Sequence, residues 1–538
     1  MSQPSAVLAN DVDAANRRAR TQAHSADGGF QGGVTGLVTY NSAGRLLVIG
    51  SDPAQVQRAL DLAAPLRPAV LLLGTGRQVL AGVTTWHAPR EEIQLSGWLG
   101  AFRLRLLGQG EGEERFDLVM DLAESPCIAT PLPPPGYLAP GPDEPALDEA
   151  LDILRGLVGA FDKPRYFNYD PDICAHGMKG TTACRRCIDA CPADAITSLA
   201  TRVQVEPFLC QGGGACATAC PTGAMTYAYP SVEDVLDKVR RLLSDYRAAG
   251  GKAPVLLVHD TGVGAERVEA LLADATRPSG HLIPLAVEEL ASLGLEAWIS
   301  ALAYGARAVW LVDTPVVPAS ARRELSEQLG FAQAILAGLG YPRTAVDWLD
   351  AEPAASALMP EVEPAGHAAV GRKRQLFFTA LDHLKAQARH AHPLVELPAG
   401  APFGTATVDE KACTLCMACV TVCPGKALLD GQDVPQLRFL EANCVQCGLC
   451  TRSCPEDAIW ISPRLLLDAQ ARARTRLLRE DSPFQCVSCG KAFATTAVIG
   501  RMQQRLAGHS MFSDPKALRR LQMCGDCRVA DMMHAQDI

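Results

Sequence analysis

Short apolar runs alternate with amphipathic stretches over the first quarter of the chain, and this pattern predicts a small α/β domain. Strands are expected at residues 46–49, 69–73, 102–107 and 116–122, with a helix over 53–64 between the first two. Residues 131–145, which are crowded with proline and glycine, are expected to form a linker. We therefore assign 1–145 to an N-terminal α/β domain and its proline-rich linker.

A second α/β pattern covers residues 231–355. It opens with a helix whose apolar side chains share one face, namely Val232, Val235, Leu236, Val239, Leu242, Leu243 and Tyr246. Strands are expected at 255–258, 282–285, 308–312 and 344–348, with helical crossovers over 287–304 and 319–339. This order predicts a parallel, doubly wound sheet, followed by a linker with a helix over 356–400.

Length and composition fit a protein of several domains. The 538 residues exceed what one core normally supports, and 48% of them are hydrophobic. A net charge of −9 without a basic tract, together with 5% aromatic residues, gives no support for binding nucleic acid. The sequence offers no apolar run suited to a signal peptide or a membrane span, so we expect a cytoplasmic protein. Its twenty cysteines are then expected to bind metal rather than to form disulfides.

Two cysteine runs within 401–463 repeat the spacing Cys-x2-Cys-x2-Cys-x3-Cys-Pro. Three cysteines on a tight loop can wrap one 4Fe–4S cluster, while the cysteine before proline reaches across to the other cluster. The two expected ligand sets are Cys413, Cys416, Cys419 and Cys454, and Cys444, Cys447, Cys450 and Cys423. Structural or disulfide-bonded cysteines are the alternative, but this register is hard to produce by chance. The module resembles the bacterial two-cluster ferredoxins.

A less regular copy of this module is expected at 160–230. Its runs are Cys174-x9-Cys184-x2-Cys187-x3-Cys191-Pro192 and Cys210-x5-Cys216-x3-Cys220-Pro221. Cys174, Cys184, Cys187 and Cys220 could complete one 4Fe–4S cluster, because a loop can lengthen without moving its ends far. The other set, Cys210, Cys216 and Cys191, lacks a member because Gly213 stands where the middle cysteine is expected. A 3Fe–4S cluster, a 4Fe–4S cluster with an open iron, and a site without metal all remain open.

The last segment, 464–538, holds paired knuckles typical of a site with four thiolates. The expected ligands are Cys486, Cys489, Cys524 and Cys527. Zinc is the expected metal, and a mononuclear iron of the rubredoxin kind is the alternative. Helices are expected at 497–506 and 515–523. Cys127 stands apart from all these groups and is interpreted as a free structural thiol.

The remaining polar and glycine-rich positions form no recognisable catalytic set. Gly74-Thr75-Gly76 is expected to be a tight turn. The loop 259–264 follows a strand, where it could receive a flavin or nucleotide, although connecting glycines explain it equally well. His176 is expected to tune or shield a neighbouring cluster rather than to transfer protons.

Two further resemblances concern larger parts of the chain. Around 300–306, the middle domain resembles the delta-subunit domain of methyl-viologen-reducing hydrogenases, although the cysteines of that domain are absent here. Nearly the whole chain resembles bacterial multidomain 4Fe–4S-binding proteins associated with formate dehydrogenase systems, through the stretches 172–176, 444–450 and 483–491. Gly213 departs from that pattern too. The resemblance implies a formate-oxidising molybdenum or tungsten enzyme, or a reductase fed by it, as a redox partner.

These observations predict an iron–sulfur electron carrier, a polyferredoxin with two two-cluster modules, two α/β domains and a terminal metal knuckle. It would relay single electrons between partner proteins and need no organic substrate. One alternative is a flavin- or nucleotide-dependent oxidoreductase subunit, and another is a maturation or docking scaffold for a molybdoenzyme. A carrier or an oxidoreductase subunit is favoured over a stand-alone enzyme.

Overall fold

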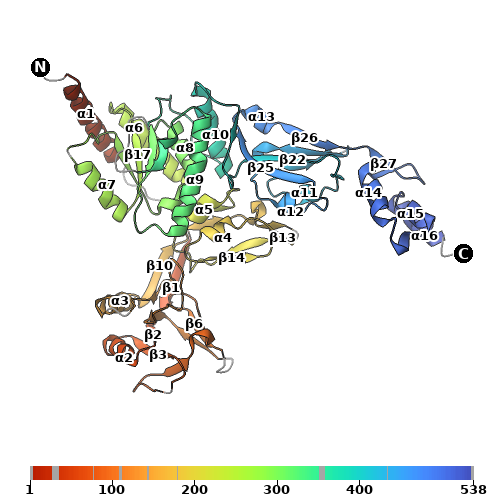
Figure 1. The fold of residues 1–538 in the computed structure, drawn as a ribbon. Coiled ribbons are helices and arrows are strands. Elements are labelled where there is room, and N and C mark those ends of the chain that lie inside the picture. The colour runs from red at the N-terminus through yellow and green to blue at the C-terminus, as the bar shows by residue number, and fades with distance from the viewer. Residues whose placement is uncertain are drawn as a thin grey trace.

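The computed structural model describes residues 4–26, 36–76, 78–107, 112–141, 144–178, 180–274, 276–349, 358–432 and 434–534. A central α/β domain and the cysteine-rich parts lie together, and the N-terminal domain hangs below them on a two-stranded ribbon (Figure 1). This ribbon pairs β1 (Leu37–Ser42) antiparallel with β10 (Gly159–Pro164). The last helices lie at the far end from α1 (Figure 1).

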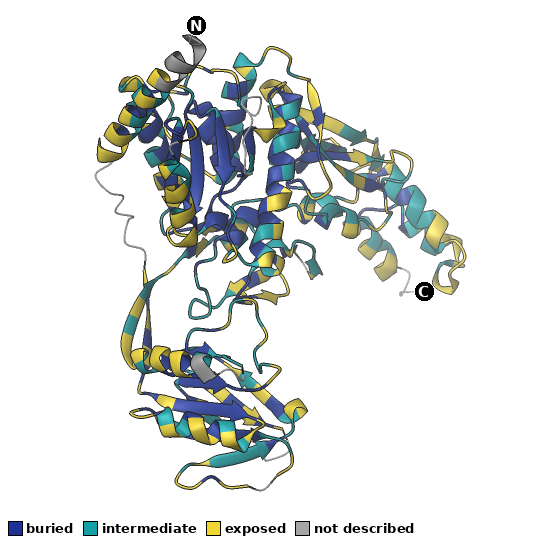
Figure 2. Cartoon of the chain, turned by 60° about the vertical axis from the view of Figure 1, so that its left-hand side comes forward, coloured by how far each residue is buried: buried dark blue, intermediate teal, exposed yellow. Residues whose placement is uncertain are grey.

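The N-terminal domain is built on a parallel sheet in the order β4-β3-β2-β8-β9. Its strands are β2 (Arg45–Gly50), β3 (Arg67–Leu73), β4 (Thr85–Ala88), β8 (Leu118–Asp121) and β9 (Tyr137–Leu138). One face packs against α2 (Pro53–Leu62) and α3 (Glu144–Gly156). The other packs against an antiparallel sheet of β5 (Ile93–Ser96), β6 (Phe102–Leu106) and β7 (Glu113–Phe116). Both faces are therefore buried (Figure 2).

This arrangement differs from the expected domain boundaries at both ends. The strand expected at 116–122 is split, because β7 ends at Phe116 in one sheet and β8 begins at Leu118 in the other. The expected linker supplies β9, where the Tyr137 hydroxyl donates a 2.6 Å hydrogen bond to buried Asp121. Helix α1 (Pro4–Ala26) packs instead against the central domain.

The central domain confirms the expected parallel sheet, in the order β18-β17-β19-β20. Its strands are β17 (Val255–Asp260), β18 (Leu282–Val287), β19 (Ala308–Leu311) and β20 (Val346–Trp348). One face packs with α6 (Val232–Ala248), α8 (Leu295–Ala303) and α9 (Ala319–Gly338), and the other with α7 (Val263–Ala273). The expected apolar face of α6 is buried, with Val232 partly so. The helix expected from residue 287 begins only at Leu295, because β18 extends to Val287.

Helix α10 (Lys373–Gln387) lies within 356–400, where a helix was expected in a linker, but it belongs to this core. Its buried side chains, Leu376, Phe377, Ala380, Leu381 and Leu384, pack beside α8.

The two cysteine-rich segments share one plan, in which an antiparallel strand pair is joined to a hairpin and two short helices. In the upstream segment these are β11 (Phe167–Tyr169) with β16 (Met225–Tyr227), β14 (Ile196–Leu199) with β15 (Arg202–Val205), α4 (Arg186–Ala190) and α5 (Ala215–Ala219). In the downstream segment they are β22 (Gly404–Val408) with β25 (Ile459–Leu466), β23 (Leu428–Asp430) with β24 (Gln436–Leu440), α11 (Ala418–Thr421) and α12 (Leu449–Arg452). The internal repeat seen in the sequence is thus also a repeat of structure.

Further elements extend the two segments. Upstream, the long gap between Cys174 and Cys184 holds a small hairpin of β12 (Gly177–Met178) and β13 (Thr181–Thr182). Downstream, β21 (Leu394–Glu396) pairs with β25 and β26 (Thr475–Glu480) with β24, and α13 (Ala469–Ala473) lies between β25 and β26 in the chain.

The C-terminal part pairs β27 (Pro483–Gln485) with β28 (Ala492–Thr495) and continues into α14 (Thr496–Leu506), α15 (Pro515–Arg520) and α16 (Gly525–His534). The two expected helices agree with α14 and α15. Within the described ranges, no helix is both long and apolar enough to cross a bilayer.

Candidate metal centres

The structure gathers the fifteen cysteines of the two segments into four groups. Site A contains Cys191, Cys210 and Cys216; site B contains Cys174, Cys184, Cys187 and Cys220; site C contains Cys423, Cys444, Cys447 and Cys450; site D contains Cys413, Cys416, Cys419 and Cys454. These are the groups that the spacing predicts. In each segment, each of the two runs gives one cysteine to the other run's group, as the crossed arrangement requires.

Sites C and D are two compact cavities with almost apolar walls. The cysteines of site C line about 390 Å³ of open space, together with Leu428, Phe439 and Ile461. Those of site D line about 370 Å³, together with Leu437 and Ile459. Burial raises the pKa of Cys447 and of Cys419 to about 12, so these thiols hold their protons at neutral pH without a metal. Metal binding must therefore displace protons.

Backbone N–H groups point at several of the sulfurs. The N–H of Ala427 donates to Cys423 Sγ at 3.2 Å, and the N–H of Ala458 donates to Cys454 Sγ at 3.3 Å. In the upstream segment the N–H of Met225 donates to Cys220 Sγ at 3.3 Å. All three bonds involve the cysteine that precedes proline. Such bonds stabilise negative charge on sulfur and set the reduction potential of a bound cluster.

The loops that carry the expected ligands of sites C and D have left-handed backbone on both sides of the middle cysteine. Leu415 and Met417 flank Cys416 with φ of 56° and 59°, and Gln446 and Gly448 flank Cys447 with 53° and 79°. At site A, Gly212 and Gly214 flank Gly213 with φ of 87° and 70°. Site A therefore keeps the turn of a ligand loop and lacks only the thiol.

Site A is also a cavity, with about 460 Å³ of open space. A Cβ placed on Gly213 would meet only the ring of Pro192, at 3.4 Å, which is an ordinary contact. On Gly214 it would lie 2.6 Å from the backbone nitrogen of Ser292, which is too close. The position of the missing side chain is thus open space within a preserved loop.

The cysteines of site B lie in or near two short helices: Cys187 is in α4, Cys184 precedes α4, and Cys220 follows α5. Burial raises the pKa of Cys184, and the charges of Cys220 and Cys174 add to the shift. His176, which is 1% exposed, contacts the carbonyl oxygen of Cys184 and the hydroxyl of Ser198, both at 2.7 Å. These two contacts tie the loop that carries Cys184 to β14.

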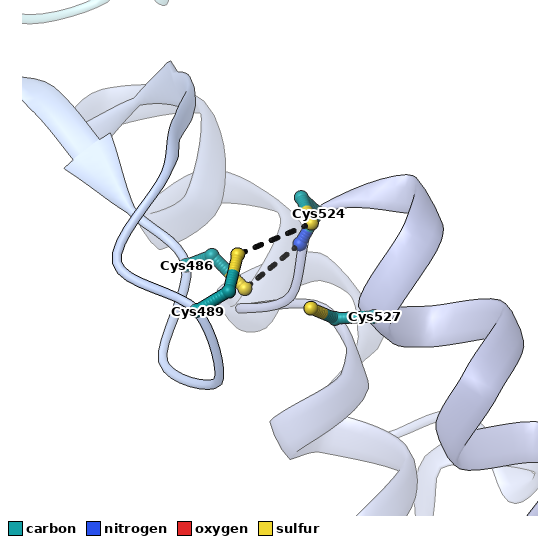
Figure 3. A group of neighbouring side chains, drawn as sticks. All are labelled: Cys486, Cys489, Cys524 and Cys527. Atoms are coloured by element: carbon teal, nitrogen blue, oxygen red, sulfur yellow. Dashed lines mark hydrogen bonds between the residues drawn. The ribbon is translucent and has the colours of Figure 1, made fainter.

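The C-terminal knuckles bring four sulfurs together, as Figure 3 shows. The Sγ atoms of Cys486, Cys489, Cys524 and Cys527 all lie within 4.8 Å of one another, and those of Cys489 and Cys524 are 3.8 Å apart. A tetrahedral site with metal–sulfur bonds of about 2.3 Å has sulfur–sulfur edges of about 3.8 Å. Burial opposes ionisation of Cys486, but N–H groups of Cys524, Cys489 and Ser488 lower its pKa to about 6. The spacing of the four sulfurs therefore suits a tetrahedral metal ion.

Three basic residues that sequence reasoning did not single out contact the ligand loops. Lys163 Nζ donates to the carbonyls of Cys210 at 2.6 Å and Phe208 at 3.2 Å. Lys373 and Arg374, at the start of α10, bind carbonyls beside sites B and C. No local spacing reveals these contacts, because each joins segments far apart in the chain.

The loop 259–264 after β17 was a candidate site for a flavin or nucleotide, but the side chain of Asp260 occupies the start of α7 there. Asp260 Oδ1 accepts hydrogen bonds from the N–H groups of Gly262 at 2.9 Å and Gly264 at 3.0 Å. These are the groups at the start of α7 that would hold a phosphate. The connecting-loop interpretation therefore accounts for the glycines.

Cys127 lies apart from these groups, in the N-terminal domain. Its backbone N–H donates to Asp121 at 2.6 Å, and burial raises the pKa of its thiol to about 12.

Two known protein families match parts of the two cysteine-rich segments. Residues 412–459 match a family described as a 4Fe-4S dicluster domain, and residues 203–226 match one described as a 4Fe-4S binding domain. No curated protein matches the chain. The chain thus contains two ferredoxin-type 4Fe–4S domains, which suggest a role in iron–sulfur electron transfer.

Proposed function

We propose that the chain is a polyferredoxin that relays single electrons between redox partner proteins. The observation that carries this proposal is the regrouping of the cysteines, in which Cys423 and Cys454 each leave their own run and line the cavity of the other. Such crossing, with this spacing and a proline after each crossed cysteine, is the arrangement of two adjacent cubanes. When bound, each cluster accepts and returns one electron.

We propose the ligand sets as sites A to D, with 4Fe–4S clusters at B, C and D. Site A would take a 3Fe–4S cluster or a 4Fe–4S cluster with an open iron, because its loop is intact and its three cysteines line a cavity. The knuckle of Cys486, Cys489, Cys524 and Cys527 would take zinc, with mononuclear iron as the alternative, since both form sites of this size.

We propose different roles for the different domains. Residues 160–230 and 401–463 are the proposed electron-carrying modules, and the α/β domain over 231–355 is a docking or spacing element, of the hydrogenase delta-subunit kind by its resemblance. A formate dehydrogenase or related molybdenum or tungsten enzyme is the proposed partner, on resemblance alone. Reduced thiols suit the cytoplasm.

The oxidoreductase alternative would require a flavin or nucleotide in an α/β domain, and Asp260 occupies the helix start that would serve one. A maturation scaffold would hold clusters that do not change oxidation state in use.

The test is anaerobic purification with assays of iron, sulfide and zinc, and EPR spectra before and after dithionite. About fifteen or sixteen irons with one zinc, and interacting signals on reduction, are expected. Eight irons or fewer would contradict the proposal. Clusters that cannot be reduced, together with stable binding of a client enzyme, would favour the scaffold, and a flavin spectrum would favour the oxidoreductase subunit.

A further inference from the structure

The two ferredoxin-type modules contact each other directly, although the central α/β domain separates them in sequence. Arg452 Nη1 donates a 2.6 Å hydrogen bond to the carbonyl of Thr182. Arg452 ends α12 and follows Cys450 of site C by two residues, while Thr182 lies in β13, two residues before Cys184 of site B. Figure 1 shows α12 beside β13 where the modules meet. The contact therefore joins the ligand loops of sites B and C.

Helix α10 holds the same two sites from another direction. Lys373 Nζ donates to the carbonyls of Ala217 at 2.8 Å and Thr218 at 2.7 Å in α5, and Lys373 lines a cavity together with Cys220 of site B. Arg374 donates to the carbonyls of Ala442 at 2.7 Å and Cys444 at 3.1 Å, within site C. One rigid helix thus fixes a ligand of site B and a ligand of site C relative to each other.

Within each module the two sites are adjacent. Helix α4, which carries Cys187 of site B, packs against α5, which carries Cys216 of site A. Helix α11, which carries Cys419 of site D, packs against α12, which carries Cys450 of site C. Site B is therefore next to site A, and site C is next to site D.

The outer sites face different parts of the molecule. At site A, Leu132 of the N-terminal domain lines the cavity and its N–H donates to Pro192 at 3.0 Å. At site D, Cys416 is exposed, and Thr495 of the C-terminal part donates to the carbonyl of Thr414 at 3.0 Å. Sites A and D are therefore the two ends of the arrangement.

We propose that sites A, B, C and D form one series in that order, with electrons crossing between the modules at the contact of site B with site C. This rests on the proposed function. One electron moves at each step, so that one site is oxidised as its neighbour is reduced, and no proton or further reactant is needed. The consequence is that every electron exchanged between the ends passes the Arg452–Thr182 contact.

The test removes one downstream cluster at a time from the full-length protein. Cys447→Ala with Cys450→Ala empties site C, and Cys416→Ala with Cys419→Ala empties site D as the matched control. The measurement is the microwave power saturation of the reduced upstream module by EPR, because a nearby reduced cluster accelerates its relaxation. Loss of site C should lower the half-saturation power several-fold, and loss of site D should leave it close to wild type.

Equal effects of the two double variants, or an effect of site D alone, would overturn the order while leaving the electron-carrier function intact. An absence of reducible clusters in the wild-type protein would instead contradict the proposed function. If a double variant also loses upstream iron, dipolar EPR on the partly reduced wild-type protein replaces it. A coupling between modules as strong as that within a module is then expected, and a much weaker one would overturn the series.

Discussion

Lys373 and Arg374 are consecutive residues, yet their side chains bind carbonyl groups in different ferredoxin-type modules. Lys373 reaches the upstream module and pairs with buried Glu296 at 3.6 Å, whereas Arg374 reaches the downstream module and stacks over Phe403 at 4.8 Å. Burial lowers the pKa of Arg374 to about 10, which leaves it charged at neutral pH. Each module therefore has one fixed positive charge from the same helix start.

Replacing these two cations one at a time should shift two different reduction potentials. Lys373→Gln should lower the potential of the site B cluster, and Arg374→Gln that of the site C cluster, because a cation stabilises the added electron. The shifts should be on the order of tens of millivolts. A redox titration followed by EPR measures both. A shift of the same cluster by both substitutions would contradict this assignment.

Arg374 should contribute more to the stability of the folded protein than the neighbouring Arg372 does. Arg374→Met leaves the carbonyls of Ala442, Pro402 and Cys444 without this donor, which should cost about 2–4 kcal/mol. Arg372→Ala is the control, since its side chain is 67% exposed and pairs with Asp170 at 3.6 Å, so a loss within about 0.5 kcal/mol is expected. Anaerobic thermal unfolding compares the variants, and equal midpoints would refute the structural role of Arg374.

Gly213→Cys should restore a fourth thiolate at site A. The new Cβ has room beside Pro192 and the loop already has the required backbone, so one more iron per protein and loss of any oxidised 3Fe–4S signal are expected. Gly214→Cys is the matched control, because its Cβ would collide with Ser292 and its φ is 70°. Iron analysis and EPR decide the outcome. An oxidised 3Fe–4S signal that persists in Gly213→Cys would contradict the assignment of that signal to site A, and an unchanged iron count without any 3Fe–4S signal in either protein would contradict a 3Fe–4S cluster there.

The C-terminal metal should be lost independently of the clusters. Cys524→Ser should release one metal ion and expose α14 to α16 to proteolysis while iron at sites A to D stays constant, with Cys127→Ser as a control that changes neither. Against the effect of burial, backbone N–H groups lower the pKa of Cys486 to about 6, but the pKa of Cys527 is raised to about 12. Metal binding at neutral pH must therefore displace protons, and the bound metal should fall as the pH is lowered. Metal analysis at several pH values tests this. If iron falls in place of zinc, the knuckle is a redox site.

Cys127 should be the unreactive thiol of the folded protein. With its pKa raised to about 12, roughly one molecule in ten thousand carries the thiolate at pH 8, so iodoacetamide should modify it only after unfolding. Mass spectrometry of native and denatured protein provides the comparison. Rapid modification of the native protein would show that the thiol is accessible and ionised.

The cysteines that the spacing grouped lie near one another in the structure, because their loops are local and the turns are encoded within a few residues; that they bind clusters stays a prediction. Periodicity likewise predicted the parallel central sheet and the buried face of α6. Contacts across the chain had no such signal. Neither Arg452 nor Arg374 is marked by its neighbours, since the carbonyls they bind lie 270 and up to 70 residues away. Proline and glycine around Tyr137 indicated a loop, but the hydrogen bond to Asp121 and pairing with β8 fix a strand there.

The position of α1 at the start of the chain affects how the protein folds during its synthesis. Its partner α6 begins roughly two hundred residues later, so at ribosomal rates of about 5–20 residues per second α1 waits on the order of ten to forty seconds for its binding surface. The side chains that it eventually buries are small or polar, as with Ala19, Ala23 and Asn16. Asn16 accepts from Lys252, and Arg20 donates to Ser279 at 2.6 Å. Over residues 11–26, whose side chains the structure describes, the helix therefore docks through alanines and hydrogen bonds rather than through large apolar side chains.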